Sequence, residues 1–510
     1  MEDPGNITYI GSSPKGFGDD KHVLDSPETG THSPPAAAAT ATATVHWSHL
    51  VSEKLSTWGV ESRGIQPVDV EDRTETHFVK IFFVWFSANT TVVPFALGTL
   101  GPTAFGLSLS ESCLAVFLFN MIFSIYPAYY ATFGPRLGLR QLCMSRYTYG
   151  YYGAIVPSLL SIIRGFGFCI LSTVLGGQVL GSLADIGGSI GILIIGGASL
   201  FISFGGIKFV NWYENYAWIP VVVVFVVVAS VNGKHFVDAP VTPGTLAQIS
   251  NFAVILSGQM LPWAALSSDY TVYFHPRVSS WRIFAYSYLG FCMPTIALQC
   301  LGAAAAASSP FVPHWKAGYA QHGVAGLLDA MLSPVGKFGK CLMIILSLSV
   351  TAANAPTIYS MSLAFQTFIP PLVARPRYVF SVFAVVLINV LALAGLHKSN
   401  ANLSDFLGII EYWAGTWVVA VLVEHMVIRK RKFANYDVRS WDIPSQLPLG
   451  AAALGSSILG FGLAIPTISQ VWYTGPIGRK FGDAGIAVSM LLTALFYFPL
   501  RRLEKYWRGF

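Results

Sequence analysis

Charged residues are scarce in this sequence. Asp, Glu, Lys and Arg together make up 11% of its 510 residues, whereas soluble domains typically contain about 25%. Hydrophobic residues account for 53%, and the mean hydropathy is +0.56. This balance excludes an ordinary soluble protein and indicates a chain that crosses a lipid bilayer several times.

Motifs that would indicate an enzyme or a metal centre are also missing. The six cysteines have no metal-ligand spacing, and most lie within or beside apolar stretches, so we expect them to pack as hydrophobic residues without disulfides. The eleven histidines form no HxxxH or HExxH pair within an apolar stretch. An integral-membrane enzyme is therefore disfavoured, and no cofactor is expected. A channel would need rings of like groups along a continuous pore and would not accumulate its solute.

Long apolar stretches dominate the rest of the chain. A window of about 19 residues finds about twelve of them that could cross a hydrocarbon core of roughly 30 Å as α-helices. They lie near residues 78–100, 107–133, 150–180, 187–207, 214–232, 250–272, 282–306, 334–364, 376–397, 403–428, 447–470 and 482–502. Short alternating segments, which a membrane β-barrel would need, do not dominate. The sequence predicts an all-α integral membrane protein with about twelve transmembrane helices.

The first 72 residues have a different composition. They are rich in Gly, Ser, Thr, Pro and Asp and contain the low-complexity run PPAAAATATATV from Pro34 to Val45. Such a segment buries too little apolar surface to fold alone, so we predict a disordered tail. It shows no signal-peptide pattern, so we expect no cleaved leader. The predicted division is a tail at 1–72, a core of ten spans at 73–432 and a peripheral part with two spans at 433–510.

Lys and Arg are concentrated in alternate connections between the spans. If the tail is cytoplasmic, most of these residues, including the RKRK run at 429–432, fall on the cytoplasmic side. The positive-inside rule then places both termini in the cytoplasm, which agrees with an even number of spans. The net charge of +6 comes largely from these connections and indicates no nucleic-acid partner. No feature of the sequence specifies an oligomeric state.

Two of the predicted spans contain polar interruptions. The sixth reads SGQMLPWAALSSDYTVY from Ser257, and the first reads VWFSANTTVVPFALG from Val84. Backbone groups freed at such breaks are tolerated in a membrane only where protein or a water-filled cavity surrounds them. The two breaks fall in corresponding positions if spans 1–5 and 6–10 are repeats. This pattern favours an inverted-repeat transporter with a midplane site, the alternative being two kinked helices without a site.

Several stretches resemble a known family. They are QVWYTGPIGRKFGDAGIAVSMLLTALFYFPLRRLEKYWRG from Gln470, VLVEHMVIRKRKFANYDVRSWDIPSQLPLGAAAL from Val421, GGQVLGSLAD, PWAALSSDYTVY and NAPTIYSMSL. From about residue 70 to its end the chain resembles fungal purine-cytosine permeases of the nucleobase-cation symporter family. The resemblance implies the LeuT-type fold, a 5+5 inverted repeat with broken helices 1 and 6 plus two peripheral helices. It also implies proton-coupled uptake of nucleobases such as cytosine and purines across the plasma membrane.

A planar heterocycle needs a stacking ring and a few polar groups. Trp263 matches the stacking tryptophan of the family, whereas Phe168 and Ser172 stand where the family usually has a second tryptophan and an asparagine. On span 8 the chain reads Ala-Asn-Ala-Pro-Thr where the family has roughly Asn-Asn-Ile-Pro-Asn. The substrate-binding candidates are Ser87, Asn89, Arg164, Phe168, Ser172, Gln259, Trp263, Asn354 and Thr357. The departures leave a permease for another small heterocycle, such as a vitamin B6-type pyridine or a pathway-specific metabolite, as the alternative function.

Charged residues inside the spans have two interpretations each. Arg164 lies one turn from Phe168 and is predicted either to pair with an intramembrane acid such as Glu411 or to contact an acidic or carbonyl-rich ligand. Asp269 and Glu411 are candidates for carrying the coupled proton, or for simply holding a helix end or pairing with Arg164. Ser349 and Thr351, with Ser347, Ser87 and Asn89, could instead supply oxygens to a sodium ion. Glu424 and His425 are expected at the cytoplasmic end of span 10.

Overall fold

The protein is described by a computed structural model that covers residues 54, 61, 63–183, 187–237, 243–396, 401–470 and 472–508, with the side chains of 374 and 401–410 left aside. Most of the predicted tail therefore lies outside the described residues. The fold below belongs to the compact unit Lys54–Phe510.

The described residues form helices and loops, with isolated β-bridges at Glu75–Phe274 and Ser469–Thr474 as the only strand-like pairing. The first half contains α2 (Phe78–Asn89), α3 (Val92–Phe105), α4 (Leu109–Phe123), α5 (Ile125–Ala131), α6 (Phe133–Leu137), α7 (Gln141–Met144), α8 (Arg146–Tyr149), α9 (Ile155–Gly181), α10 (Gly188–Phe204) and α11 (Ile207–Asn232). The second half contains α12 (Leu246–Met260), the 3₁₀ turns η2 (Leu261–Ala265) and η3 (Ser267–Tyr270), α13 (Ser280–Ser308), α14 (Pro313–Leu332), α15 (Gly336–Ser349), α16 (Thr351–Phe368), α17 (Arg377–Gly395) and α18 (Ala401–Val423). A π-helical turn, η7 (Glu424–Ile428), α19 (Ala451–Ala464), α20 (Gly478–Phe481) and α21 (Gly485–Arg508) follow.

Every predicted span contains a helix, which confirms the all-α membrane fold. Seven helical stretches of the described part are long and apolar enough to cross a membrane on their own, or eight if α2 and α3 count as one bent span. The remaining predicted spans correspond to α10, α12, α18 and α19. Helices α10 and α19 have only 17 and 14 residues, and α12 gives way to 3₁₀ turns at its polar break. Span 5 begins earlier than predicted, because α11 starts at Ile207 and not near 214.

Both predicted breaks are present. Helix α2 ends at Asn89 and α3 begins at Val92, with an angle of 53° between them. Thr91 adopts an extended backbone, and its hydroxyl accepts a hydrogen bond from the Val93 N–H, which caps α3. Helix α12 ends at Met260, and Pro262 follows within the first turn of η2. Because proline has no N–H, Pro262 cannot donate the α-helical hydrogen bond to the Gly258 carbonyl, which favours a break at this position.

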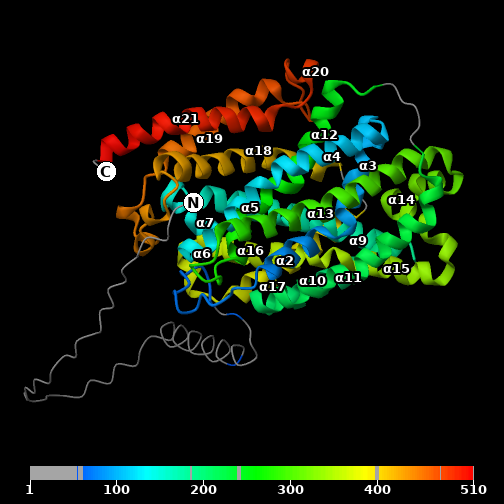
Figure 1. Cartoon of the computed structure of the whole chain (residues 1–510), viewed down its shortest axis with the longest axis horizontal. Helices are drawn as coiled ribbons and strands as arrows, with labels where there is room; N and C mark the ends of the chain where they lie inside the picture. Colours follow the sequence, from blue (N-terminus) through cyan, green and yellow to red (C-terminus); the bar gives the residue numbers. More distant parts are fainter. Residues whose placement is uncertain are drawn as a thin grey trace, which may run out of the picture. The chain divides into compact units, whose positions relative to one another are not determined.

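The last two long helices lie at one edge of the bundle. Helices α19 and α21 pack on each other and on α18, and Figure 1 shows these three side by side. By contrast, α9 is surrounded by α10, α15, α16, α17 and α18, and α13 packs against α2, α3, α4 and α5. The two broken helices, together with α9 and α16, therefore lie in the interior of the protein.

The end of the predicted tail is packed against the helices. Ile65 and Val68 are buried, and the Ile65 side chain belongs to a core cluster that also contains Trp85 and Trp263. Glu61 forms an ion pair with Arg140, with 3.0 Å between Oε1 and Nη2, and accepts a hydrogen bond from the Tyr273 hydroxyl at 2.8 Å. The described end of the 1–72 segment is therefore bonded to Arg140, just before α7, and to Tyr273, just after η3.

Candidate functional site

The two breaks meet through an amide pair. The Gln259 Nε2 of α12 donates to the Asn89 Oδ1 of α2 at 3.3 Å, and the Asn89 Nδ2 donates to the Trp85 carbonyl at 2.9 Å. Both side chains are buried. Polar groups predicted from separate spans thus lie together inside the protein, where a broken helix can be tolerated.

Aromatic rings gather beside this pair. The Trp263 ring of η2 makes edge contacts with Trp85 at 5.7 Å and with Phe168 of α9 at 6.1 Å between ring centroids. Trp85 stacks on Phe291 at 4.6 Å and meets Tyr270 edge-on at 5.1 Å. The indole N–H groups of Trp85 and Trp263 are buried and have no hydrogen-bond partner among the described residues. These are donors and aromatic faces of the kind that a planar heterocycle requires.

Asn354 is oriented by helix α9. Its Oδ1 lies 2.5 Å from the Ser172 hydroxyl, and its Nδ2 donates to the Thr173 hydroxyl at 3.0 Å. In the same helix, the Thr357 hydroxyl donates to the Ala353 carbonyl at 2.8 Å. The predicted residues of spans 3 and 8 therefore lie together, with most of the Asn354 amide used within the protein.

Hydroxyl groups join the start of α16 and the end of α15 to other helices. The Ser349 hydroxyl accepts from the Val92 N–H at 3.1 Å and donates to the Leu346 carbonyl at 2.6 Å. The Thr351 hydroxyl lies 2.5 Å from the Tyr213 hydroxyl, and Ser347 donates to the Gly176 carbonyl at 2.8 Å. Ser349 thus lies against the first break, whereas Thr351 and Ser347 face α11 and α9.

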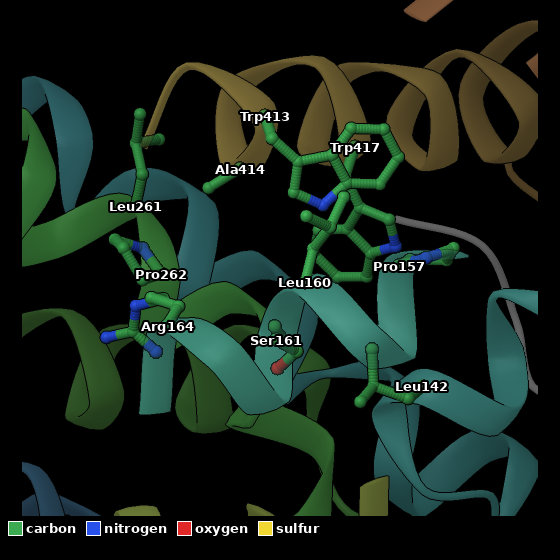
Figure 2. A pocket seen from close by; sticks show the side chains of 11 residues that line it. Leu142, Pro157, Leu160, Ser161, Arg164, Leu261, Pro262, Trp413, Ala414 and Trp417 are labelled. Carbon is green, nitrogen blue, oxygen red and sulfur yellow. The ribbon is translucent and has the colours of Figure 1, made fainter. Parts of the chain in front are cut away.

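Arg164 lines a small cavity of about 20 Å³ between α9, η2 and α18. In Figure 2 its guanidinium lies beside Pro262, with Trp413 and Trp417 on the far side of the cavity. The guanidinium carbon is 5.9 Å from the centroid of the Phe168 ring, a distance at which cation–π attraction acts. The cavity has room for about one water molecule.

Glu411 lies near Arg164 without forming an ion pair in the described structure. The two groups interact electrostatically, but no N–O distance between them falls within 4.0 Å. The Glu411 carboxylate packs against Gly258, where an added Cβ would lie 2.0 Å from Oε2. Glu411, the predicted partner of Arg164, therefore lies near it, and the Arg164 guanidinium also borders the 20 Å³ cavity.

Asp269 holds a helix start. Its Oδ1 accepts from the Gln141 N–H at 2.9 Å, at the beginning of α7, and Arg140 donates to the Asp269 backbone carbonyl at 2.9 Å. Its carboxylate thus has a backbone donor, and its backbone carbonyl has the Arg140 guanidinium.

Glu424 and His425 lie in the π-helical turn after α18. Glu424 pairs with Arg429 at 3.0 Å and Arg501 at 3.2 Å, and it accepts from the Tyr497 hydroxyl at 2.8 Å. These contacts fasten the end of α18 to α21, away from the aromatic site.

Four residues around the breaks were not among the predicted site residues. They are Trp85, Tyr270, Phe291 and Glu214. Tyr270 donates to the Pro356 carbonyl at 2.8 Å and so connects η3 to α16. The sequence signal for Trp85 and Tyr270 was their place inside the two polar interruptions, whereas Phe291 has no local signal and meets Trp85 only in the fold.

Comparison with known proteins agrees with this architecture. A family model described as "Permease for cytosine/purines, uracil, thiamine, allantoin" matches residues 67–440. The chain is 32% identical to the purine-cytosine permease fcyB of Emericella nidulans, over 87% of this chain and 89% of that protein. It is 27% identical to the vitamin B6 transporter TPN1 of Saccharomyces cerevisiae, over 89% of each chain.

A solved structure supports the fold. The structure of Mhp1, a nucleobase-cation-symport-1 family transporter in a closed conformation with bromovinylhydantoin bound, has a TM-score of 0.66 with this chain. The two are 14% identical, and the match covers 88% of this chain and 95% of that chain. At this level of identity the likeness concerns the LeuT-type fold.

Proposed function

Because the chain belongs to the family of permeases for cytosine and purines, uracil, thiamine and allantoin, we propose that this multi-pass membrane transporter takes up nucleobases such as cytosine and purines. Uptake is driven by protons and proceeds by alternating access across the plasma membrane, with both termini in the cytoplasm. Residues 73–432 form the transporting core and residues 433–510 its peripheral part.

One observation carries the proposal. The Gln259–Asn89 hydrogen bond joins the two broken helices at 3.3 Å, directly beside the rings of Trp263, Trp85 and Phe168. A nucleobase offers two aromatic faces and an edge of donors and acceptors, and this place offers rings together with amide groups and unpartnered indole N–H groups. Separating the amide pair would open the space between the rings.

A second candidate is a small heterocycle of the vitamin B6 type. Its support is the chemistry of α9, where Phe168 and Ser172 stand and where Asn354 is already held by Ser172 and Thr173. A base edge would find fewer free amide groups here than in a site with two asparagines. The similarity to a vitamin B6 transporter points in the same direction.

Uptake by yeast cells that lack their own permeases separates the two candidates. Cells that express this chain should accumulate labelled cytosine or adenine, and unlabelled nucleobase should compete whereas pyridoxine should not. Saturable pyridoxine uptake without competition by nucleobases would replace the first candidate with the second. Trp263→Ala, brought to the cell surface at a matched level, should bind either substrate poorly and serves as the site control.

The proton is the preferred coupling ion, and sodium is the alternative. Ser349, with the carbonyl groups around the first break, offers oxygens suited to sodium, whereas the buried acids of the core can carry a proton. Omitting sodium from the medium should leave uptake unchanged, and a protonophore should abolish accumulation.

A further inference from the structure

Glu214 is a buried acid that takes part in none of the contacts described above for the candidate site. It lies in α11, seven residues after Ile207, and its side chain is fully buried. Both of its carboxyl oxygens lack a hydrogen-bond partner in the described structure. No ion pair between described residues involves it.

The carboxyl group lies at the first break. It faces the Ser87 hydroxyl of α2, which is close enough to interact with it and has no other hydrogen-bond partner among the described residues. The Ser87 carbonyl accepts from the Thr90 N–H at 2.9 Å, and this turn ends the helix. Trp218 of α11 holds the two helices together by stacking on Phe83 with ring centroids 5.2 Å apart. Any movement of α2 at its break therefore changes the surroundings of Glu214.

Among the described residues, no cation compensates this acid. The titratable groups that interact with it are the tyrosines Tyr213 of α11 and Tyr270 of η3. No Lys, Arg or His faces it from α2, α10, α14, α15 or α16, the helices packed against α11, within the part of the chain that the structure describes. A negative carboxylate without partners in such a place costs several kcal/mol, and a proton on the carboxyl removes that cost.

The other acids of the core differ in this respect. Asp269 accepts from the Gln141 N–H, and Glu411 has the Arg164 guanidinium nearby. Each of these two acids therefore has a donor or a cation close to its carboxylate. Glu214 is the one buried acid of the described residues with both oxygens unpartnered.

We propose that Glu214, facing Ser87 at the first break, is the group that binds and releases the transported proton. This inference deepens the proposed function and rests on it. In the outward-open state, a hydronium ion in the outside water gives its proton to the carboxylate: one O–H bond of the hydronium breaks, an O–H bond on the carboxyl forms, and a neutral water molecule is left. The neutral carboxyl can then be enclosed and donate to the Ser87 hydroxyl. When the site opens inward, the O–H bond breaks and the proton passes to water on the cytoplasmic side.

The test compares Glu214→Gln with wild type in yeast cells and in proteoliposomes of purified protein. Glutamine has the size of the neutral carboxyl but carries no exchangeable charge. We expect Glu214→Gln to retain exchange of labelled for unlabelled cytosine across vesicles, to lose accumulation above the external concentration, and to lose the dependence of uptake on external pH. Glu71→Gln, the same change at an exposed glutamate, should accumulate like wild type.

Each outcome decides between stated alternatives. Accumulation by Glu214→Gln at the wild-type ratio would overturn the inference, and so would a loss of proton coupling in Glu411→Gln together with its retention in Glu214→Gln. Wild-type accumulation that requires sodium but no proton gradient would also overturn it. If Glu214→Gln does not reach the membrane, Glu214→Asp keeps the carboxyl and should still accumulate, with a shifted pH profile, and an unshifted profile would contradict the role. A wild type that transports no nucleobase fails the proposed function instead.

Discussion

Both helix breaks leave buried backbone groups without their α-helical partners, and the two breaks satisfy these groups in different ways. At the first break, between α2 and α3, Thr91 caps the new helix with its own hydroxyl, and an α-helix resumes at Val92. At the second break, α12 is followed by the 3₁₀ turns η2 and η3, and no α-helix resumes before α13. The first break is satisfied by the Thr91 cap and by one partner from another helix, the Ser349 hydroxyl, which accepts from the Val92 N–H at 3.1 Å.

The second break is satisfied by its neighbours. The Ser268 N–H donates to the Gln141 side chain at 3.3 Å, and the Ser268 hydroxyl donates to the Tyr130 carbonyl at 3.1 Å. The Thr271 hydroxyl donates to the Ala131 carbonyl at 2.7 Å. Because buried backbone groups need partners, an irregular segment inside a membrane protein persists only where a surrounding structure supplies them. The comparison teaches that a local cap can be seen in a sequence, whereas a set of tertiary partners cannot.

The largest expected effect concerns the ring on the second break. Trp263→Ala should raise the KM of nucleobase uptake roughly tenfold to a hundredfold, because stacking of a base on an aromatic side chain contributes about 1–3 kcal/mol. Trp263→Phe should retain much of the affinity. Kinetics of labelled cytosine uptake at matched surface expression measure both, and an unchanged KM in the alanine variant would remove Trp263 from the site.

A glycine near each break tests how rigid its surroundings are. An added Cβ at Gly98 in α3 would lie 2.0 Å from the Gln299 backbone carbonyl oxygen, and at Gly258 in α12 it would lie 2.0 Å from the Glu411 carboxylate. A side chain can move aside more readily than a backbone, so Gly98→Ala should destabilise more, by about 1–3 kcal/mol or above. Thermal unfolding of the purified variants measures this order. Gly197→Ala, where no atom lies within 4 Å, is the control.

Loss of one hydrogen-bonding group at each break should cost about 1 kcal/mol. Thr91→Val removes the helix cap while keeping the shape of the side chain. Ser268→Ala removes one of several tertiary contacts. We expect Thr91→Val to lower the unfolding temperature at least as much as Ser268→Ala. The reverse order would show that the Thr91 cap contributes less to the first break than the Ser268 contact contributes to the second.

A double-mutant cycle on Asn89 and Gln259 measures the link between the breaks. Asn89→Ala and Gln259→Ala should show a coupling energy of about 0.5–1.5 kcal/mol in unfolding experiments, since their side chains bond directly. Additive effects would mean that the two breaks are held together by packing alone.

The smallest expected effect concerns Glu61, which is paired with Arg140, and it depends on pH. Burial alone would raise the pKa of the Glu61 carboxyl, but the Arg140 and Arg377 guanidiniums and hydrogen bonds from Ile207 and Tyr273 keep its pKa below the ordinary value. A lowered pKa in the folded state means that Glu61 stabilises the protein above the ordinary glutamate pKa, and that this stabilisation disappears as pH falls through the folded-state value. Wild type should therefore lose its advantage in melting temperature over Glu61→Gln between neutral and strongly acidic pH. A constant difference would contradict this sign.

Much of the arrangement could be foreseen from particular residues. Pro262 after Gly258 and Gln259, and Thr90 and Thr91 before Pro94, indicated two interrupted spans. Glu214 could not be identified in this way, because the polar stretch NWYENY reads as the edge of a span. In the fold, α11 starts at Ile207 and carries Glu214 into the interior.

The sequence by itself determined the membrane setting, the succession of helices and the places where two of them break, because hydropathy, proline and small polar residues act over a few residues of chain. Only the tertiary structure decided which groups meet there. It placed Gln259 against Asn89, Phe291 against Trp85, and Glu214 beside Ser87 with no cation from the described residues. Contacts between residues of different helices are determined by how the helices pack, and no local sequence pattern predicts this packing.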